Sequence, residues 1–353
     1  MRVDPETLCL LGGYGDVGLR LARLLHDQTA FTIVLAGRSA GRADTAARAV
    51  GPRCRGMALD VRMPGALAPL AGMALCVNLT EATPPHLAAS LIANGTHFID
   101  SAASPAYVAD LRRAIDAVSV PQAMAVLETG LAPGLTNLLA RRMCQARPET
   151  SSIDILIELG MGAHHGLAAT EWSLQALAQT YPMKSGGQWQ EIRTGALSRH
   201  FATERGSIRG IGFSFSDQAS IARDLNLDGA RTFLALDPSW MTTVMGWLSR
   251  SPLRNMAARK AGPLARIMQR LPVMGATATR LTLEGRNARN EVIATHSVSG
   301  GEQAGMTATV IAQVVQEVLR PTTAARPGLQ ALDALLDPAS ISEDPFGVSG
   351  YDL

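Results

Sequence analysis

The chain has 353 residues, of which 47% are hydrophobic and 18% are charged, and its formal net charge is only +2. This composition permits a sizeable core, excludes a wholly disordered chain, and gives no electrostatic argument for a nucleic-acid partner. No stretch approaches the roughly 18 uninterrupted apolar residues of a membrane-spanning helix, so we expect no stable membrane insertion. The length predicts about two domains, and a small molecule is the expected partner.

The cysteines and the first residues indicate a location. Cys9, Cys54, Cys76 and Cys144 lack the spacing of a metal site, so no metal is expected. Cys9 and Cys76 fall inside predicted strands and are interpreted as buried thiols of a reducing compartment. The start, MRVDPET, has no basic region followed by an apolar stretch, and we therefore expect no secretory signal and a cytoplasmic protein.

The first part of the chain alternates short apolar strands with amphipathic helices. The predicted strands are residues 7–11, 31–36, 56–60, 74–79, 96–100 and 122–127. The predicted helices are residues 17–27, 43–50, 85–94 and 105–118, with a short turn at 64–70. Six short strands separated by crossovers predict an α/β fold with a doubly wound parallel sheet of the Rossmann type.

A glycine-rich turn joins the first strand to the first helix. Leu8 to Gly18 read LCLLGGYGDVG, which contains the spacing G-x-G-x-x-G. In this motif Gly13 permits the tight turn, Gly15 lets the backbone approach a pyrophosphate, and Gly18 lets the helix pack closely. Free N–H groups at the helix start hold the phosphates, although a purely structural turn is the alternative. The predicted cofactor-binding residues here are Gly13, Tyr14, Gly15, Asp16, Val17 and Gly18.

The end of the second strand favours NADP(H) over NAD(H). An NAD site places an acidic residue about 20 residues after the glycines, but Gly37-Arg38-Ser39 stands there. Arg38 and Ser39 suit a 2′-phosphate through charge-assisted hydrogen bonds, with a solvated loop arginine as the alternative. Asp60 and Val61, after the third strand, and Asn78 and Thr80, at the end of the fourth, complete the predicted cofactor-binding set.

The pattern changes after Pro148 and predicts a second, α+β domain with a mixed or antiparallel sheet. Its predicted strands are residues 152–159, which alternate as a half-buried strand, 207–215, 231–236, 277–284 and 292–299. Helices are predicted from Thr170, at 239–250 and at 303–320. We expect an NAD(P)-binding domain at residues 1–128, a substrate and dimerisation domain at 129–320, and a C-terminal tail at 321–353.

Five motifs make the chain similar to the saccharopine dehydrogenase family, which includes saccharopine reductase and the lysine dehydrogenase-like and carboxynorspermidine dehydrogenase-like enzymes. They are Gly12–Gly18, Ala36–Ser39, Val77–Thr80 with the proline-started helix after it, Phe98–Ser101 and, above all, Gly130-Leu131-Ala132-Pro133-Gly134. The family's form of the last motif is G-x-D-P-G. Ala132 replaces the acidic residue, which puts any substrate contact through that carboxylate in question.

The resemblance implies a function and an assembly. It implies hydride transfer at a carbon–nitrogen bond, an inserted second domain that forms a homodimer, and a tail that returns to the first domain. We therefore expect an NADPH-dependent oxidoreductase that reduces an imine formed from an amine and a carbonyl compound, or runs the reverse reaction. The alternatives are a reductase of a carbon–carbon double bond and a catalytically silent NADP-binding scaffold.

Three residues are the candidates for catalysis. His164 and His165 lie in a glycine-flanked loop at a predicted strand end, where a near-neutral imidazole suits proton transfer to an imine. At most one of these neighbours faces a site, and solvated loop histidines are the alternative. Glu128 stands at the carboxyl edge of the first sheet, where ligands of such folds bind. It is predicted to orient a substrate amine, or else to cap the backbone.

A stripe of large apolar residues marks the predicted helix 239–250. Trp240, Met241, Val244, Met245, Trp247 and Leu248 repeat at helical spacing, which predicts a core or dimer face. The basic residues from Arg250 to Arg270 that follow are interpreted as a solvated helix face. A lid over an anionic substrate and a weak membrane-surface contact are the alternatives.

Overall fold

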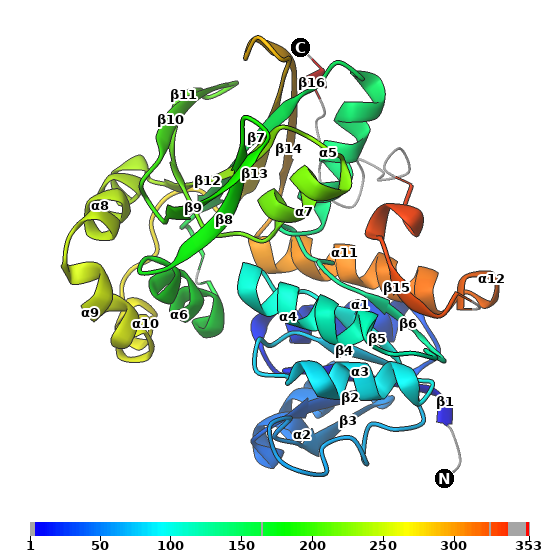
Figure 1. The fold of residues 1–353 in the computed structure, drawn as a ribbon. Helices are drawn as coiled ribbons and strands as arrows, with labels where there is room; N and C mark the ends of the chain where they lie inside the picture. Colours follow the sequence, from blue (N-terminus) through cyan, green and yellow to red (C-terminus); the bar gives the residue numbers. More distant parts are fainter. Residues whose placement is uncertain (1–3, 164, 325, 338–350, 353) are drawn as a thin grey trace. The chain divides into compact units, whose positions relative to one another are not determined.

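The computed structural model describes residues 4–163, 165–324, 326–337 and 351–352, which fall into two compact units (Figure 1). The first unit holds the chain up to Leu135 together with Thr307–Asp337. The second holds Thr136–Met306 and the described residues at the C-terminus.

A seven-stranded, all-parallel sheet forms the centre of the first unit, in the order β15-β6-β5-β4-β1-β2-β3. Its strands are β1 (Asp4–Leu11), β2 (Thr32–Gly37), β3 (Cys54–Ala58), β4 (Met73–Asn78), β5 (His97–Asp100), β6 (Met124–Val126) and β15 (Gly328–Gln330). Its helices are α1 (Asp16–Gln28), α2 (Ala40–Val50), α3 (Pro85–Ala93), α4 (Pro105–Asp116), most of α11 (Gln303–Val318) and α12 (Pro321–Ala324). The predicted doubly wound sheet is confirmed, and the strand order reverses between β1 and β4, where such folds bind ligands.

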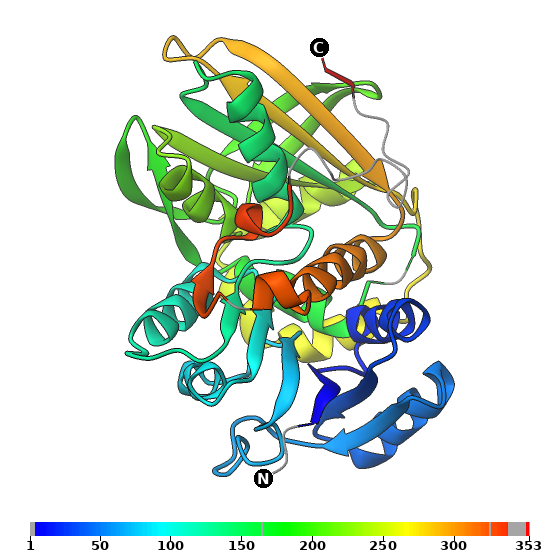
Figure 2. The same cartoon turned by 90° about the vertical axis from the view of Figure 1, so that its right-hand side faces the viewer.

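Both faces of this sheet are buried, as a parallel sheet requires. On one face Cys9, Val34, Cys76 and Phe98 pack together with the leucines of α3 and α4. On the other face α1 and α11 lie side by side (Figure 2), and Gln316 of α11 donates a hydrogen bond to Gln28 at 2.8 Å. The two strand cysteines are buried free thiols, as predicted.

The division of the chain differs from the predicted boundaries of 128/129 and 320/321. The segment after Glu128 stays with the first unit up to Leu135 because Thr129 donates to the carbonyl of Asp100 in β5. Residues from Thr307 also group with the first unit, and β15 adds a strand to its sheet. Within the predicted tail, β15 pairs with β6 of the first sheet, whereas β16 (Tyr351–Asp352) pairs with the second sheet.

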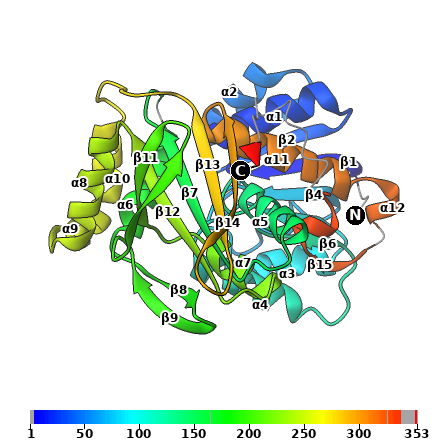
Figure 3. The ribbon, with the colours of Figure 1, turned by 90° about the horizontal axis from the view of Figure 1, so that it is seen from above.

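The second unit is built on a mixed seven-stranded sheet in the order β10-β11-β12-β7-β13-β14-β16 (Figure 3). Its strands are β7 (Ser152–Gly160), β10 (Ser198–Thr203), β11 (Gly206–Gly212), β12 (Gly229–Asp237), β13 (Thr279–Arg286), β14 (Val292–Gly300) and β16. A separate hairpin consists of β8 (Thr180–Ser185) and β9 (Gln188–Arg193). The helices are α5 (Leu135–Ala146), α6 (Leu167–Ala176), α7 (Asp217–Asp224), α8 (Ser239–Arg250), α9 (Leu253–Arg259) and α10 (Ala261–Met268).

The prediction that β7 is half-buried is wrong, because β7 lies inside the sheet and is buried along most of its length. Its alternating polar residues, Asp154 and Glu158, are less than a tenth exposed. Arginines from other strands, and one from the turn between β10 and β11, neutralise them. Asp154 pairs with Arg199, Arg231 and Arg286, while Glu158 pairs with Arg205 and Arg280.

Candidate functional site

The turn after β1 has the geometry of a dinucleotide-binding loop. Gly12, with φ at +82°, carries the left-handed backbone, so the tight turn depends on Gly12 rather than on Gly13. A Cβ on Gly13 would lie 2.7 Å from the carbonyl oxygen of Leu10. A Cβ on Gly18 would lie 2.6 Å from the carbonyl oxygen of Gly13, so α1 packs directly on the turn. Both positions require glycine for steric reasons.

Gly15 differs from its neighbours because its outer side is open. It is the N-cap of α1, and among the described residues other than Gly15 and its two chain neighbours only the carbonyl oxygen of Gly12, at 3.2 Å, lies within 4 Å of an ideal Cβ there. The turn thus offers backbone N–H groups at the start of a 13-residue helix beside a space that a side chain would fill. The predicted neighbour Asp16 pairs with Arg20 at 3.0 Å, one turn along the same helix, and Val17 is half-buried. The glycine turn therefore fits the pyrophosphate of a dinucleotide.

Tyr14 connects this turn to the end of β2. Its hydroxyl accepts a hydrogen bond from the backbone N–H of Ser39 at 3.3 Å, and its ring lies 4.6 Å below the guanidinium of Arg42. A Cβ on Gly37 would lie 2.8 Å from the Tyr14 hydroxyl oxygen, so glycine is needed at the end of β2. Tyr14 therefore fixes the position of the glycine turn after β1 relative to the loop between β2 and α2.

Two arginines and the start of α2 gather at this end of β2. Ser39 is the N-cap of α2, and its hydroxyl accepts from the backbone N–H of Arg42 at 3.4 Å. Arg38 and Arg42 are both exposed. Sequence reasoning missed Arg42, although its place one turn after Arg38, in the first turn of a helix, is a detectable signal. Exposed guanidinium groups beside a helix N-terminus suit the 2′-phosphate of NADP(H).

Asp60 and Val61 follow β3 at the same edge of the sheet. Both carboxylate oxygens of Asp60 accept from Arg62, and these hydrogen bonds hold the pKa of Asp60 down at about 2. The charge of Arg38 lowers that pKa further. Arg62 is the hydrogen-bond partner of this carboxylate.

Asn78 lies at the centre of a buried polar network rather than on a surface. Its amide nitrogen donates to Asp100 at 2.5 Å and to the Tyr107 hydroxyl at 3.1 Å, and its amide oxygen accepts from Thr83 at 2.7 Å. These bonds use both amide N–H groups and one acceptor position of the oxygen, so Asn78 positions the loop after β4. The predicted Thr80 is half-buried in that loop, and its hydroxyl accepts from the backbone N–H of Ala82.

Asp100 is the most perturbed acid in this network. Burial raises its pKa to about 7, against the opposing effect of hydrogen bonds from the Ala102 N–H and the Asn78 amide. The charges of Glu81 and Glu128 add to the increase. Sequence reasoning used Asp100 only as part of a motif and missed this property, because nothing local in the sequence indicates complete burial.

Glu128 stands at the start of the GLAPG loop, with φ at +63°. Its carboxylate is 6% exposed and lies 3.6 Å from the Arg112 guanidinium of α4. The loop after it is closed by a hydrogen bond from the Gly130 N–H to the Pro133 carbonyl at 2.8 Å. Ala132 contributes only a half-buried methyl group where the family motif has a carboxylate. Glu128 therefore has a charged partner, and its predicted contact with a substrate amine stays a prediction.

The predicted histidines lie in the second unit, after β7. His164 lies outside the described residues. The Nε2 atom of His165 lies 3.1 Å from the carbonyl oxygen of Gly160, and the His165 carbonyl accepts from the Gln269 amide at 2.6 Å. A carbonyl only accepts, so Nε2 carries the hydrogen and Nδ1 is the atom left to exchange a proton.

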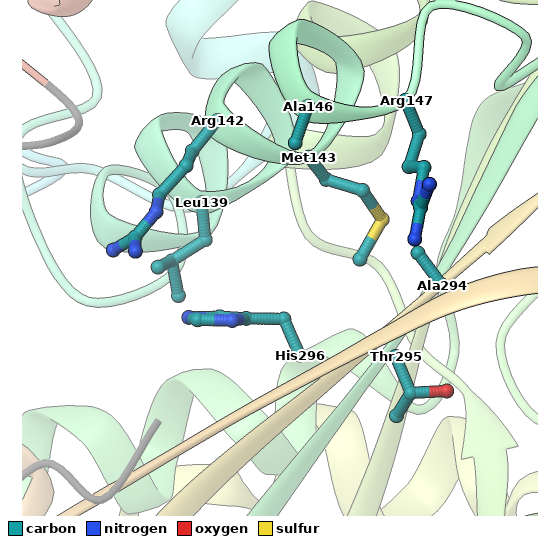
Figure 4. A pocket seen from close by; sticks show the side chains of 8 residues that line it. All are labelled: Leu139, Arg142, Met143, Ala146, Arg147, Ala294, Thr295 and His296. Atoms are coloured by element: carbon teal, nitrogen blue, oxygen red, sulfur yellow. The ribbon is translucent and has the colours of Figure 1, made fainter. Parts of the chain in front are cut away.

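A pocket of about 290 Å³ lies between α5 and β14 in the second unit (Figure 4). Arg142 and His296 stand at one end, Arg147 at the other, and Met143 over the middle. None of the predicted site residues lines it. In the parts of the chain that the structure describes, no group of three or more His, Cys, Asp or Glu side chains is placed to hold a metal ion.

The fold and the glycine turn define a chain with a Rossmann-type domain joined to a second α/β unit. Its fold is that of saccharopine dehydrogenase. The L-glutamate-forming saccharopine dehydrogenase of Saccharomyces cerevisiae, solved in its apo form, superimposes with a TM-score of 0.68. The match covers 99% of this chain and 100% of the yeast enzyme at 14% sequence identity.

Two other solved structures are less similar. The DAP dehydrogenase of C. glutamicum, in complex with DAP, matches with a TM-score of 0.44 at 12% identity, over 95% of this chain and 96% of its own. An engineered D-amino acid dehydrogenase bound to NADP+ matches with a TM-score of 0.42 at 10% identity, over 97% of each chain. Both scores are too low to support an argument. No family model matches the chain, and no curated protein matches it.

Proposed function

We propose that this protein is an NADP(H)-dependent oxidoreductase that transfers hydride at the carbon–nitrogen bond of a small amine or amino-acid derivative, in either direction. The observation that carries the proposal is a full-length saccharopine dehydrogenase fold combined with the open glycine turn and the arginines at the end of β2. The fold supports the reaction class, and the arginines support the phosphorylated form of the cofactor.

The chain's own residues have distinct roles in this proposal. The turn from Gly12 to Gly15 and the start of α1 bind the pyrophosphate, because the first N–H groups of the helix have no intrahelical acceptor and its N-terminal end is positive. Arg38, Arg42 and the N–H groups at the start of α2 bind the 2′-phosphate. When bound, the cofactor supplies or accepts the hydride, and the protein provides orientation and proton transfer.

The proton donor in this proposal is one of the two histidines of the loop after β7. For His165, the bond between Nε2 and the Gly160 carbonyl sets the ring orientation and leaves Nδ1 to give a proton to, or take one from, the substrate nitrogen. Glu128 is the candidate for orienting a substrate amine. Its carboxylate lies 3.6 Å from the Arg112 guanidinium, which would hold it in place.

A spectrophotometric assay of the cofactor tests the proposal directly. Purified protein is mixed with NADPH and a panel of amines, each paired with a panel of 2-oxo acids, and nicotinamide absorbance is followed. We expect steady oxidation of NADPH with at least one pair, and slower oxidation of NADH with the same pair. The protein could instead bind NADPH, turn over none of the pairs and reduce an enoyl substrate. That result would show that it reduces a carbon–carbon double bond and would contradict the proposed reaction.

A catalytically silent NADP(H)-binding scaffold is the second candidate, and Ala132 is the observation that favours it. The loop keeps its turn geometry, yet the acidic side chain of the family's motif is absent. Ala132→Asp distinguishes the two candidates. If the wild type turns over a pair and the variant changes only KM, Ala132 affects substrate affinity and the protein is an enzyme. If neither protein shows turnover, the scaffold is supported.

The proposal includes a homodimer in the cytoplasm. A reducing compartment agrees with four free cysteines, two of which are buried neighbours in β1 and β4. Light scattering after gel filtration tests the dimer. We expect a mass near twice that of the chain.

A further inference from the structure

Three helices of the second unit, α8, α9 and α10, are packed with their small residues inside and their large apolar residues outside. Their buried positions are Thr242, Gly246, Ser249, Ala257, Ala261 and Ala265. Their exposed large apolar positions, together with Leu271 three residues after the end of α10, are Trp240, Val244, Trp247, Leu253, Met256 and Ile267. We call this second set the α8–α10 face. An ordinary surface helix has the opposite arrangement.

The packing of α8 explains the inversion. Thr242 exchanges hydrogen bonds with the backbone of Leu236 in β12, and a Cβ on Gly246 would lie 3.3 Å from Ile211 in β11. This close approach leaves no room for large side chains between the helix and the sheet. Trp240, Val244 and Trp247 therefore form a stripe on the outer side, and they are 52%, 51% and 62% exposed. For these three residues the core alternative of the predicted core or dimer face is wrong, and the dimer alternative stays a prediction.

The charge of this segment has a single sign. Residues 238–283 contain seven arginines and lysines and no aspartate or glutamate, while the rest of the chain has 25 basic and 30 acidic residues. Six of the seven belong to the helices and their flanks: Arg250, Arg254, Arg259, Lys260, Arg266 and Arg270. Within the described residues no carboxylate forms an ion pair with any of the six, and four of the arginines bond only to backbone carbonyls. Glu171 of α6 lies beside Gly262.

We propose that the α8–α10 face docks on the surface of an anionic lipid bilayer. Exposed tryptophans among aliphatic side chains suit the boundary between headgroups and acyl chains, because an indole is apolar with one polar N–H. The unpaired arginines and lysine provide the attraction to anionic headgroups. The docking is peripheral: none of the described helices is long and apolar enough to cross a bilayer.

A second copy of the chain is a less suitable occupant of the same face. A two-fold interface would bring the basic side chains of both protomers into one patch to which this segment contributes no carboxylate, and like charges close together oppose association. An anionic surface removes this conflict. An occupant that satisfies both the exposed apolar residues and the basic side chains must have a negatively charged surface and an apolar interior. An anionic lipid bilayer has both.

Sedimentation with vesicles tests the proposal on the full-length protein. We expect binding to phosphatidylcholine vesicles that contain phosphatidylglycerol, weak binding to phosphatidylcholine alone, and loss of binding at high salt. Tryptophan emission is expected to shift to shorter wavelength on binding.

Two double variants separate the apolar contribution to vesicle binding from the ionic contribution. Trp240→Ser with Trp247→Ser is expected to abolish the emission shift and to weaken binding at least tenfold. Arg266→Gln with Arg270→Gln is expected to weaken it about thirtyfold. All four residues are exposed, so the fold is retained. The matched controls are Trp189→Ser in β9, where the indole is 51% exposed, and Arg193→Gln with Arg289→Gln, both exposed outside this face.

Three results would overturn the proposal. The first is that the wild type fails to sediment with anionic vesicles. The second is equal loss of binding in the control variants, which would show a nonspecific charge effect. The third is a dimer that dissociates in the Trp240→Ser, Trp247→Ser variant while vesicle binding is absent, because the face would then be covered by a second copy.

Discussion

The hydroxyl of Tyr14 accepts the backbone N–H of Ser39 at 3.3 Å, although 25 positions separate the two residues. This hydrogen bond ties the glycine turn after β1 to the start of α2, and Arg42 lies over the same tyrosine ring. The pyrophosphate and 2′-phosphate positions of the proposed site are therefore held by one side chain.

The first prediction concerns cofactor choice. NADPH is expected to bind at least tenfold tighter than NADH, because a charge-assisted hydrogen bond contributes about 1.5–3 kcal/mol. Arg38→Ala and Arg42→Ala should each weaken NADPH binding by about tenfold or more and leave NADH binding unchanged, as titration calorimetry can measure. Arg48→Ala, in the last turn of α2, is the control. Equal affinity of the wild type for both cofactors would contradict the assignment.

The glycine turn separates binding from folding. Gly15→Val should abolish cofactor binding and keep the fold, because only the Gly12 carbonyl lies near its Cβ. Gly18→Ala should instead lower the free energy of unfolding by about 1–3 kcal/mol, since its Cβ would overlap the Gly13 backbone. Thermal melts and calorimetry on both variants check this. Normal NADPH binding by Gly15→Val would make the motif a structural turn.

Proton transfer is tested by the neighbouring histidines. One of the variants His164→Ala and His165→Ala is expected to lose about 100-fold or more in turnover while the other changes little. Cofactor affinity should hold in both, because the proposed nucleotide-binding residues lie in the first unit. The measurement is kcat with a substrate pair found active for the wild type. If both variants keep near-normal rates, histidine is not the acid and Glu128 is the next candidate.

The buried Asp100 predicts a pH dependence of stability. Its pKa is raised to about 7 in the folded chain, against about 4 when unfolded. Between these values only the folded chain holds the proton, so the free energy of unfolding falls as pH rises from about 4 to about 7. Asp217, with a pKa of about 6, contributes in the same direction.

Asp100→Asn should flatten this slope without removing it, because Asp217 remains. Urea unfolding at several pH values measures the effect. Asp110→Asn, an exposed acid on α4 paired with Arg113, is the matched control and should leave the slope unchanged. A wild-type stability that rises over this range would disprove the assignment.

The second sheet depends on Asp154. This carboxylate is fully buried and is shared by Arg199, Arg231 and Arg286. Asp154→Ala should destabilise the protein by about 3–5 kcal/mol, because Arg231 loses its carboxylate partner and Arg199 and Arg286 are left to share Glu284. Asp224→Asn, which breaks an exposed pair with Arg223, should cost no more than about 1 kcal/mol. If chemical denaturation shows that both variants lose a similar free energy of unfolding, the buried network contributes no more to stability than an exposed ion pair.

Local rules explain what the sequence determined. Parallel strands buried on both faces are near-continuous apolar runs, so six of the seven strands of the first sheet could be predicted from residues close together in the chain. The three-residue strand β15 was not predicted. The starts of α3 and α4 followed from Pro85 and Pro105 in the first turn. The glycine turn followed from spacing, since van der Waals overlap within a few residues requires glycine at Gly13 and Gly18.

Only the tertiary structure decided the rest, because the deciding contacts join distant residues. Asp154 on β7 is stable inside the sheet because arginines 45, 77 and 132 positions away neutralise it. Arg42 joins the candidate site because the fold brings it over Tyr14. The periodicity of α8 showed one apolar side and could not show which side meets the sheet. Close packing of Thr242 and Gly246 on β11 and β12 placed the small residues inside and left Trp240 and Trp247 outside.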